Sequence, residues 1–267
     1  MATTPVLFDD LPKAVREAVE AQTGPILKVE AISAGLNSAL SARVHTATRS
    51  VFLKGLPSDH RWVWTQQREA SINPYVVPLA PHLLWQVETG GWNVLGFEAI
   101  DGHHADYRPD SPDLAMVAQA LRQLGEIPCP DVPLRRAEQR LSAYVDEPAI
   151  LKFFAGDALL HTDLNNHNVL ITDRGHLVDW GWATRGASWL DPGYWVIWLI
   201  AAGGHSPEEA ETVASQIPSW GSAPQEGVNA FAEANVRIWD EIAGADPDPW
   251  TNRMVKAAHR WRDYRLL

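Results

Sequence analysis

One stretch, residues 161–179, constrains the fold of this chain more than any other. It reads HTDLNNHNVLITDRGHLVD, in which two short apolar runs, residues 169–171 and 177–178, flank a polar turn. Apolar runs on either side of a turn that contains Asp and Gly are typical of a β-hairpin. The stretch therefore predicts two short antiparallel strands with polar side chains at both ends.

The open end of this predicted hairpin carries oxygen ligands. In a symmetric hairpin centred between Asp173 and Arg174, Asn168 lies opposite Asp179. Directly opposed residues are roughly 5 Å apart, so an amide oxygen and a carboxylate can bind the same hard cation. Mg²⁺ prefers a few such oxygen ligands together with water and phosphate oxygens. We therefore predict that Asn168 and Asp179 are magnesium ligands.

A third polar residue, Asp163, lies on the irregular loop that leads into the first strand, five residues before Asn168. A carboxylate at this point can accept a proton from an incoming hydroxyl. The alternative is that these polar residues, and His161 with them, are ordinary loop residues, because Asn and Asp favour turns for local hydrogen-bonding reasons. These four residues, His161, Asp163, Asn168 and Asp179, occur together at a spacing typical of a catalytic motif, with strands between them. The combination favours a catalytic site over an ordinary loop.

The order His-x-Asp-x-x-x-x-Asn, strand, turn, strand and Asp resembles the catalytic loop and metal-binding hairpin of the kinase fold. The sequence HTDLNNHNVLI, followed by LVDW, is similar to the corresponding motif of the aminoglycoside phosphotransferase and choline kinase family. The resemblance implies that Asp163 is the catalytic residue. Two positions depart from the family pattern, because Thr162 replaces the usual Gly and Gly181 follows the Asp-Trp pair. Protein kinases tolerate a larger residue at the first position, so Thr162 does not imply an inactive enzyme.

A lysine, Lys54, lies near the end of an apolar strand predicted over residues 51–55. A lysine that points inward from a strand is unfavourable unless it is paired. In the kinase fold this lysine contacts the α- and β-phosphates and pairs with a glutamate on the next helix. Glu69, fifteen residues further on in a helix predicted over residues 61–72, matches that glutamate. The alternative is an exposed strand-end lysine and a surface acid; the resemblance favours two nucleotide-binding residues.

A small polar loop, residues 35–38 (Gly-Leu-Asn-Ser), lies between strands predicted over residues 26–30 and 41–46. The backbone N–H groups of small-residue loops can point at phosphate oxygens, and the family often has a similar loop here. We predict that Ser38 contacts phosphate. The alternative is an ordinary hairpin turn, which would have a similar sequence.

Strands predicted over residues 82–86 and 92–99 complete an N-terminal sheet, and residues 97–102 (FEAIDG) resemble the hinge of these kinases. The resemblance implies that backbone groups near Glu98 and Ile100 hold the adenine edge. The predicted fold is α+β and protein-kinase-like, with two lobes. Residues 1–98 form a nucleotide-binding lobe with an antiparallel sheet and one main helix, residues 99–102 the hinge, and residues 103–267 a mostly α-helical catalytic and acceptor-binding lobe.

Helical periodicity and end signals predict further helices. Their predicted ranges are residues 10–22, 111–124, 135–147, 190–202, 225–243 and 249–265, with a capping box at Ser206-Pro207-Glu208-Glu209 before the last two. Asp191, at the start of the apolar helix 190–202, matches an acid that in the family supports the backbone of the catalytic loop. A plain helix cap is the alternative.

The bulk composition excludes several classes of function. The net charge of −11 argues against a nucleic acid or an anionic membrane as the main partner. The chain has one cysteine, no apolar run long enough to span a bilayer and no evident signal peptide, so we expect a cytoplasmic protein. Residues 206–248 carry nine acids against one base, Arg237. These acids form either solvated helix faces or a wall that attracts a cationic substrate.

Together these features predict a phosphotransferase that uses Mg²⁺ and ATP, or another nucleoside triphosphate, to phosphorylate a hydroxyl of a small molecule. An antibiotic-modifying enzyme, such as an aminoglycoside resistance kinase, competes with a metabolic kinase for an amino alcohol, sugar or nucleoside. A different class is a catalytically silent nucleotide-binding module. The retained Asp163, Asn168 and Asp179 argue against silence.

Overall fold

Contacts within the chain separate it into two compact units, one of residues 1–101 with 179–181 and one of residues 102–178 with 182–267. The computed structural model describes residues 4–32, 38–77 and 79–267. The first unit is built on a sheet and the second is mostly helical, which confirms the predicted α+β class. The proposed functional division into lobes and a hinge at residues 99–102 stays a prediction.

A five-stranded antiparallel sheet in the order β1-β2-β3-β5-β4 forms the first unit. A two-residue turn, Gly90-Gly91, joins the last two strands, and both glycines have positive φ angles of 56° and 76°. Such turns need this conformation at both positions, which glycine adopts without steric strain. The strands are β1 (Lys28–Ala31), β2 (Leu40–His45), β3 (Ser50–Pro57), β4 (Leu83–Thr89) and β5 (Trp92–Glu98).

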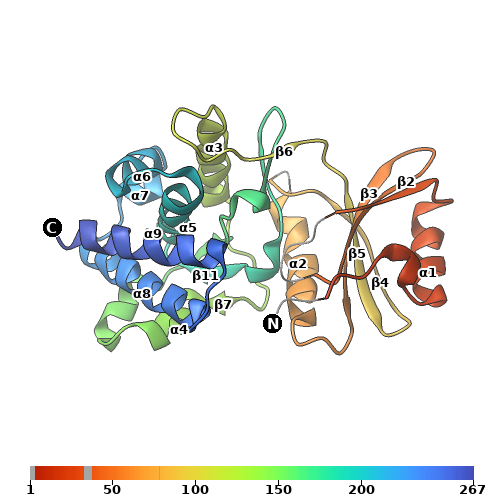
Figure 1. The fold of residues 1–267 in the computed structure, drawn as a ribbon, viewed down its shortest axis with the longest axis horizontal. Helices are drawn as coiled ribbons and strands as arrows, with labels where there is room; N and C mark the ends of the chain where they lie inside the picture. Colours follow the sequence, from red (N-terminus) through yellow and green to blue (C-terminus); the bar gives the residue numbers. More distant parts are fainter. Residues whose placement is uncertain (1–3, 33–37, 78) are drawn as a thin grey trace. The chain divides into compact units, whose positions relative to one another are not determined.

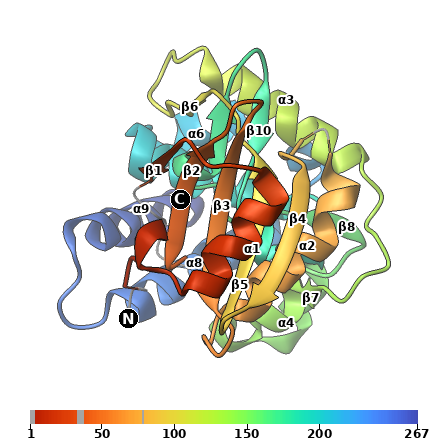
Figure 2. The same cartoon turned by 90° about the vertical axis from the view of Figure 1, so that its right-hand side faces the viewer.

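Two helices, α1 (Lys13–Thr23) and α2 (Val63–Val76), cover opposite faces of this sheet (Figures 1 and 2). A short 3₁₀ turn, η1 (Phe8–Asp10), precedes α1. Val51 and Leu53 of β3 pack with Val15 and Val19 of α1 in one buried core. Because successive side chains of a strand point to opposite faces, Lys54 belongs to the face that α2 covers. The alternation of β3 therefore directs a lysine inward toward a helix.

The helix α2 is longer than its predicted range of residues 61–72. It continues through Pro74 to Val76. Pro74 cannot donate the usual hydrogen bond to the preceding turn, but the buried Asn73 ties this end of the helix to the start of β4. Its amide donates to the Pro81 carbonyl at 2.8 Å and accepts from the Leu83 N–H at 2.8 Å. These tertiary bonds explain why the helix does not end before the proline.

The second unit combines two small three-stranded sheets with a set of helices. The sheets have the orders β10-β9-β6 and β7-β11-β8. Their strands are β6 (His103–His104), β7 (Arg135–Arg136), β8 (Ala158–Leu160), β9 (Val169–Ile171), β10 (Gly175–Leu177) and β11 (Thr184–Gly186). The α-helices are α3 (Asp113–Glu126), α4 (Ala137–Leu141), α5 (Leu190–Trp198), α6 (Pro207–Ala214), α7 (Pro218–Gly221), α8 (Gln225–Ala243) and α9 (Pro249–Arg265).

Short helical turns complete this unit: η2 (Ser142–Tyr144), η3 (Pro148–Phe153), η4 (Asn166–Asn168) and η6 (Leu199–Gly203), the last a π-turn that continues α5. The turn η5 (Trp180–Trp182) follows the hairpin and crosses from one unit to the other. The ranges predicted for α8 and α9 are confirmed. The Ser206 capping box is confirmed as well, with reciprocal bonds between Ser206 and Glu209.

The helix predicted over residues 135–147 is wrong in extent. Arg135 and Arg136 form β7, which pairs in parallel with β11, and the α-helix that follows spans only Ala137–Leu141. Helical periodicity cannot register a long-range strand pairing, so the sequence pattern overestimated this helix. The short α4 has a consequence for the site, because it carries Arg140.

Two helical glycines differ in the space around them and test the packing of the second unit. A Cβ at Gly203 would lie 2.1 Å from the Tyr107 carbonyl oxygen, whereas a Cβ at Gly125 would meet nothing within 4 Å. We expect Gly203→Ala to lower the free energy of unfolding by about 1–3 kcal/mol. The control Gly125→Ala should raise it by about 0.5–1 kcal/mol. Urea denaturation measures both, and equal effects would contradict the packing at Gly203.

Candidate active site

A buried ion cluster lies on the α2 face of the first unit. The Lys54 ammonium is 2.7 Å from a Glu69 carboxylate oxygen and 2.6 Å from Asp179 Oδ1. The side chains of Lys54 and Glu69 are nearly fully buried, and that of Asp179 is 25% exposed. The structure thus brings together three of the residues singled out in the sequence, and the pairing proposed for Lys54 and Glu69 is present.

The pKa shifts of Lys54 and Glu69 follow from their burial and from the opposite charges beside them. Burial alone would lower the pKa of Lys54, but the adjacent Asp179 and Glu69 carboxylates raise it overall, so the ammonium stays charged. Burial raises the pKa of Glu69, and the attraction of Lys54 opposes this rise. An ammonium has three N–H donors, and two of them face these carboxylates.

Glu69 also fixes the segment that follows the hairpin. One of its carboxylate oxygens accepts a hydrogen bond of 3.2 Å from the Trp180 backbone N–H. The next residue, Gly181, packs closely on α2, since a Cβ there would be 2.9 Å from Thr65 Cβ. The glycine at residue 181, where the chain departs from the pattern it resembles, is therefore explained by packing.

The loop that carries Asp163 is held by a histidine in the second unit. His161 is completely buried. Its Nδ1 accepts from the Asp163 backbone N–H at 3.3 Å, and its Nε2 lies 2.9 Å from the Val178 carbonyl oxygen. A ring that accepts at Nδ1 and meets a carbonyl at Nε2 must carry its proton at Nε2. The imidazole thereby links the loop that carries Asp163 to Val178, the residue that follows β10.

Asp191 binds the same loop from α5. Its two carboxylate oxygens accept hydrogen bonds of 2.8 Å from the backbone N–H groups of His161 and Thr162. The prediction that this acid supports the loop backbone is confirmed, and its bonds reach the loop rather than cap its own helix. Burial raises the pKa of Asp191 to about 6, against the lowering effect of these two bonds.

The register of the hairpin differs from the prediction by one residue. Leu177 pairs with Val169 and Gly175 with Ile171, so the hairpin is centred on Asp173. Asn168 therefore lies opposite Val178, whose N–H donates to the Asn168 carbonyl at 2.9 Å. The prediction that Asn168 and Asp179 are directly opposed is wrong, because the turn contains three residues, Thr172 to Arg174, rather than an even number.

The side chain of Asn168 instead binds the loop that carries Asp163. Its amide nitrogen donates to the Asp163 carbonyl oxygen at 3.2 Å. A second anchor comes from the buried Tyr107, whose hydroxyl donates to the Leu164 carbonyl at 3.0 Å. Tyr107 was missed from the sequence, since a lone tyrosine outside the motif gives no signal of this contact.

Backbone strain marks two positions of the motif. In the described part of the chain, the non-glycine residues with positive φ are Asp110, Thr162 and Asp179, and the last two have angles of 66° and 63°. A left-handed conformation is unfavourable for residues with a Cβ and persists where surrounding contacts determine it. The family's usual Gly at the position of Thr162 is the sequence signal that could have revealed this conformation.

The remaining predicted nucleotide-binding residues lie in the first unit. Ser38 is buried just before β2, whereas Gly35, Leu36 and Asn37 of the same loop lie outside the described residues. Glu98 ends β5, and its N–H donates to the His82 carbonyl at 2.8 Å. An adenine contact at this residue would therefore use its carbonyl group. Ile100 is half-buried in the irregular segment after β5.

Many acids of the C-terminal region are paired with bases of the same unit. Arg265 is 3.0 Å from Glu211, and Arg262 is 3.3 Å from Glu233. Asp248 caps α9 by accepting from two backbone N–H groups. Glu211 thus joins α6 to α9 and Glu233 joins α8 to α9, whereas Asp248 stabilises the start of α9.

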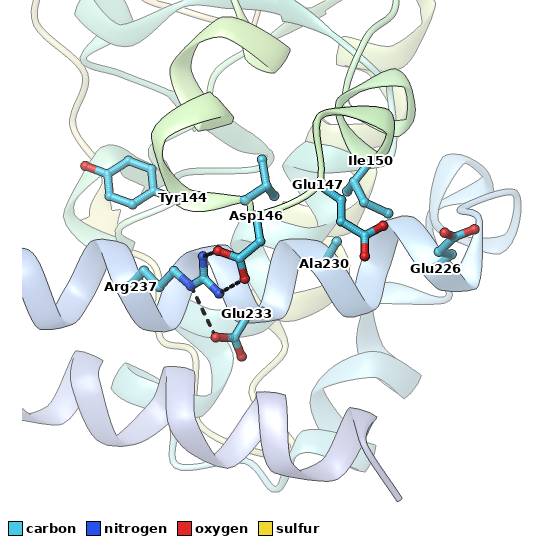
Figure 3. A pocket seen from close by; sticks show the side chains of 9 residues that line it. Tyr144, Asp146, Glu147, Ile150, Glu226, Ala230, Glu233 and Arg237 are labelled. Atoms are coloured by element: carbon cyan, nitrogen blue, oxygen red, sulfur yellow. Dashed lines mark hydrogen bonds and ion pairs between the residues drawn. The ribbon is translucent and has the colours of Figure 1, made fainter.

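A cavity of about 330 Å³ lies between α8 and the segment that joins η2 to η3. Arg237 donates to both carboxylate oxygens of Asp146, at 2.8 and 2.6 Å, and to Glu233 at 3.3 Å (Figure 3). Figure 3 also shows Glu147 and Glu226, which line the same cavity. Four carboxylates and one guanidinium line this cavity, which gives it a net negative character.

Comparison with solved structures identifies the fold. The chain resembles choline kinase LicA from Streptococcus pneumoniae, with a TM-score of 0.62, 14% sequence identity, and 94% of this chain and 98% of that chain covered. It also resembles aminoglycoside phosphotransferase APH(4)-Ia, with a TM-score of 0.63, 12% identity and coverage of 93% and 98%. For spectinomycin phosphotransferase APH(9)-Ia the values are 0.61, 10%, 94% and 93%.

These similarities define the class of fold, which is the two-lobed kinase-like fold of small-molecule kinases. The fold predicted from the motifs is thereby confirmed. No protein-family model matches the chain, and no curated protein sequence matches it. No helix among the described residues is long and apolar enough to cross a membrane.

The ion cluster predicts unequal effects of removing its members. Lys54→Met leaves two adjacent carboxylates without their shared cation, and we expect a loss of about 3–5 kcal/mol in the free energy of unfolding. Glu69→Gln should be milder because Lys54 keeps Asp179 as its partner. The double variant should be more stable than Lys54→Met alone. Urea denaturation tests this order, and additive losses would contradict the charge argument.

The buried Asp191 predicts a pH dependence of stability. Its pKa of about 6 lies above the ordinary value of 3.8, so the folded protein takes up this proton at a higher pH than the unfolded chain. The stabilisation is complete below about pH 4 and is lost as the pH rises through 6. Relative to Asp191→Asn, the wild type should gain about 2 kcal/mol between pH 7 and about 4.5. Urea denaturation at both pH values measures this difference, and a constant difference would contradict it.

Proposed function

We propose that this protein transfers the γ-phosphate of ATP, or of another nucleoside triphosphate, to a hydroxyl group of a small molecule. The observation that carries the proposal is the loop of Asp163, which is fixed by His161, Asn168 and Asp191. A catalytic carboxylate must be held in a defined position to act in phosphoryl transfer. The fold shared with small-molecule kinases supports the same reaction.

In this reaction Asp163 orients the acceptor hydroxyl and takes its proton. The hydroxyl oxygen forms a bond to the γ-phosphorus, the bond from that phosphorus to the β–γ bridging oxygen breaks, and the nucleoside diphosphate leaves. Lys54 directs its remaining N–H at the phosphates while Glu69 holds the ammonium in place. Most of the catalytic effect then comes from positioning and charge stabilisation.

Asn168 and Asp179 fit a hard divalent cation by the chemistry of their donors. Asn168 uses its amide nitrogen on the Asp163 carbonyl, which leaves its amide oxygen as the group that a cation takes. Asp179 supplies a carboxylate and has the constrained left-handed backbone noted above. Oxygen donors of this kind suit Mg²⁺. When bound, Mg²⁺ would neutralise the charge of the phosphate groups.

The nucleotide half of the proposal includes Ser38 for a phosphate contact and backbone groups at Glu98 and Ile100 for the adenine edge. Neighbouring structures are described as complexes with ADP, AMP-PNP or AMP. They support a nucleoside phosphate as the donor for this fold. The choice between ATP and GTP depends on the base contacts and is left open by these residues.

The acceptor is a small molecule whose class has two candidates. Two phosphotransferases of this fold have been solved with spectinomycin or with hygromycin B, and a third protein of this fold is a choline kinase. An antibiotic-modifying kinase and a metabolic kinase are therefore both open.

The decisive experiment combines a turnover screen with a variant. Nucleotide turnover would be measured with aminoglycosides, other antibiotics, choline, sugars and nucleosides. Asp163→Asn should lower the turnover number by about 10²–10⁴-fold and leave the affinity for Mg-ATP unchanged, since it removes the proton acceptor alone. Wild-type turnover in the variant would refute the role of Asp163. Binding of Mg-ATP without turnover of any acceptor would favour a silent nucleotide-binding module.

A further inference from the structure

Thr162 has a backbone conformation that its side chain disfavours. Its φ angle is 66°. For a residue with a Cβ the left-handed region is unfavourable by roughly 1–2 kcal/mol, and β-branching adds to the crowding. The position is directly before Asp163, so relaxation of Thr162 to an ordinary conformation would redirect the peptide that carries the catalytic carboxylate. The contacts of Thr162 must therefore offset this strain.

The hydroxyl of Thr162 is used in both directions. It donates to the Trp182 carbonyl oxygen at 2.9 Å and accepts from Arg140 Nη1 at 2.8 Å. The residue is also buried, with 8% of its surface exposed. A hydroxyl with a fixed donor and a fixed acceptor can hold one side-chain rotamer and, through it, one backbone conformation.

Arg140 is itself held in place by several groups. The same Nη1 lies 2.5 Å from the Thr184 hydroxyl and 3.3 Å from the Trp182 carbonyl oxygen. Its guanidinium carbon is 5.4 Å from the centre of the Trp182 ring, a cation–π contact. The short helix α4 supplies this arginine. Arg140 thus reaches the catalytic loop from a separate element of the fold.

The guanidinium also acts on the acid that binds the loop backbone. Its positive charge lowers the pKa of Asp191, against the larger raising effect of burial. It thereby favours the ionised carboxylate, which accepts from the N–H groups of both His161 and Thr162. The contact of Arg140 with the loop itself is the hydrogen bond to the Thr162 hydroxyl.

We propose that Arg140 is a positioning residue for Asp163 and acts by holding Thr162 in its left-handed conformation. The inference rests on the proposed function, because it takes Asp163 as the proton acceptor. It also explains how this chain accommodates threonine where related kinases usually have glycine. Glycine adopts a positive φ without a Cβ penalty, so a Thr at this position needs a partner that Gly does not.

A double-mutant cycle between Arg140 and Thr162 tests the proposal. Arg140→Met removes the donor and the charge but keeps the length of the side chain. We expect it to lower the turnover number about tenfold or more, which is the size of coupling seen between residues in contact. The Michaelis constant for ATP should stay unchanged. In a Thr162→Gly background the same substitution should lower turnover less than about threefold.

A second readout does not depend on turnover. Amide hydrogen exchange of Thr162 and Asp163 should accelerate about tenfold or more in Arg140→Met and be nearly unaffected by that change in the Thr162→Gly background. Arg136→Met is the matched control, since Arg136 lies in the adjacent strand and pairs with Glu138. It should change neither exchange at these two amides nor turnover.

These outcomes separate the inference from the proposed function. Equal losses of turnover in the wild-type and Thr162→Gly backgrounds would overturn the proposal, and so would unchanged amide exchange in Arg140→Met. A wild-type protein without turnover would refute the proposed function, while the exchange data would still decide whether Arg140 holds the loop. Arg140→Lys keeps a charge and a donor, so it should recover part of the protection against exchange.

Discussion

A buried carboxylate needs hydrogen-bond donors or a cation, and this requirement organises both halves of the candidate site. Glu69 accepts from Lys54 and from the Trp180 N–H, and so connects a strand, a helix and the end of the hairpin. Asp191 accepts from two successive N–H groups of the loop that carries Asp163. In each case the cost of an unpaired buried charge is several kcal/mol, which is large relative to the stability of a domain. The folded state is therefore strongly biased toward the arrangement that also holds the loop of Asp163, the residue proposed to be catalytic.

The sequence predicted the elements whose signals are local. Helical periodicity and end signals predicted the ranges of α8 and α9. An inward lysine on a strand needs an acidic partner, and the resemblance to the kinase fold indicated Glu69, with which Lys54 is paired. These predictions depend on rules that act within one element or between an element and the next.

The failures involve contacts that local patterns do not encode. The helix predicted over residues 135–147 is shortened because Arg135 and Arg136 pair with β11, which lies far away in the sequence. The hairpin register was missed by one residue, since the sequence does not show whether its turn holds two, three or four residues. A shift of one residue moves every side chain to the opposite face of a strand. The prediction that Asn168 and Asp179 are directly opposed depended entirely on the register of the hairpin, and it was therefore the first part of the predicted site to be wrong.

The two left-handed residues of the motif show how a chain can depart from the sequence pattern it resembles and still adopt a defined backbone conformation. At residue 162 the backbone conformation is the constraint, and either glycine or a supported side chain satisfies it. Threonine satisfies it with a hydroxyl bonded to Arg140 and Trp182. A residue other than glycine at such a position keeps the backbone conformation only when a second residue supports its side chain. Arg140 and Thr162 should accordingly be judged as one unit when the activity of a chain with this motif is inferred.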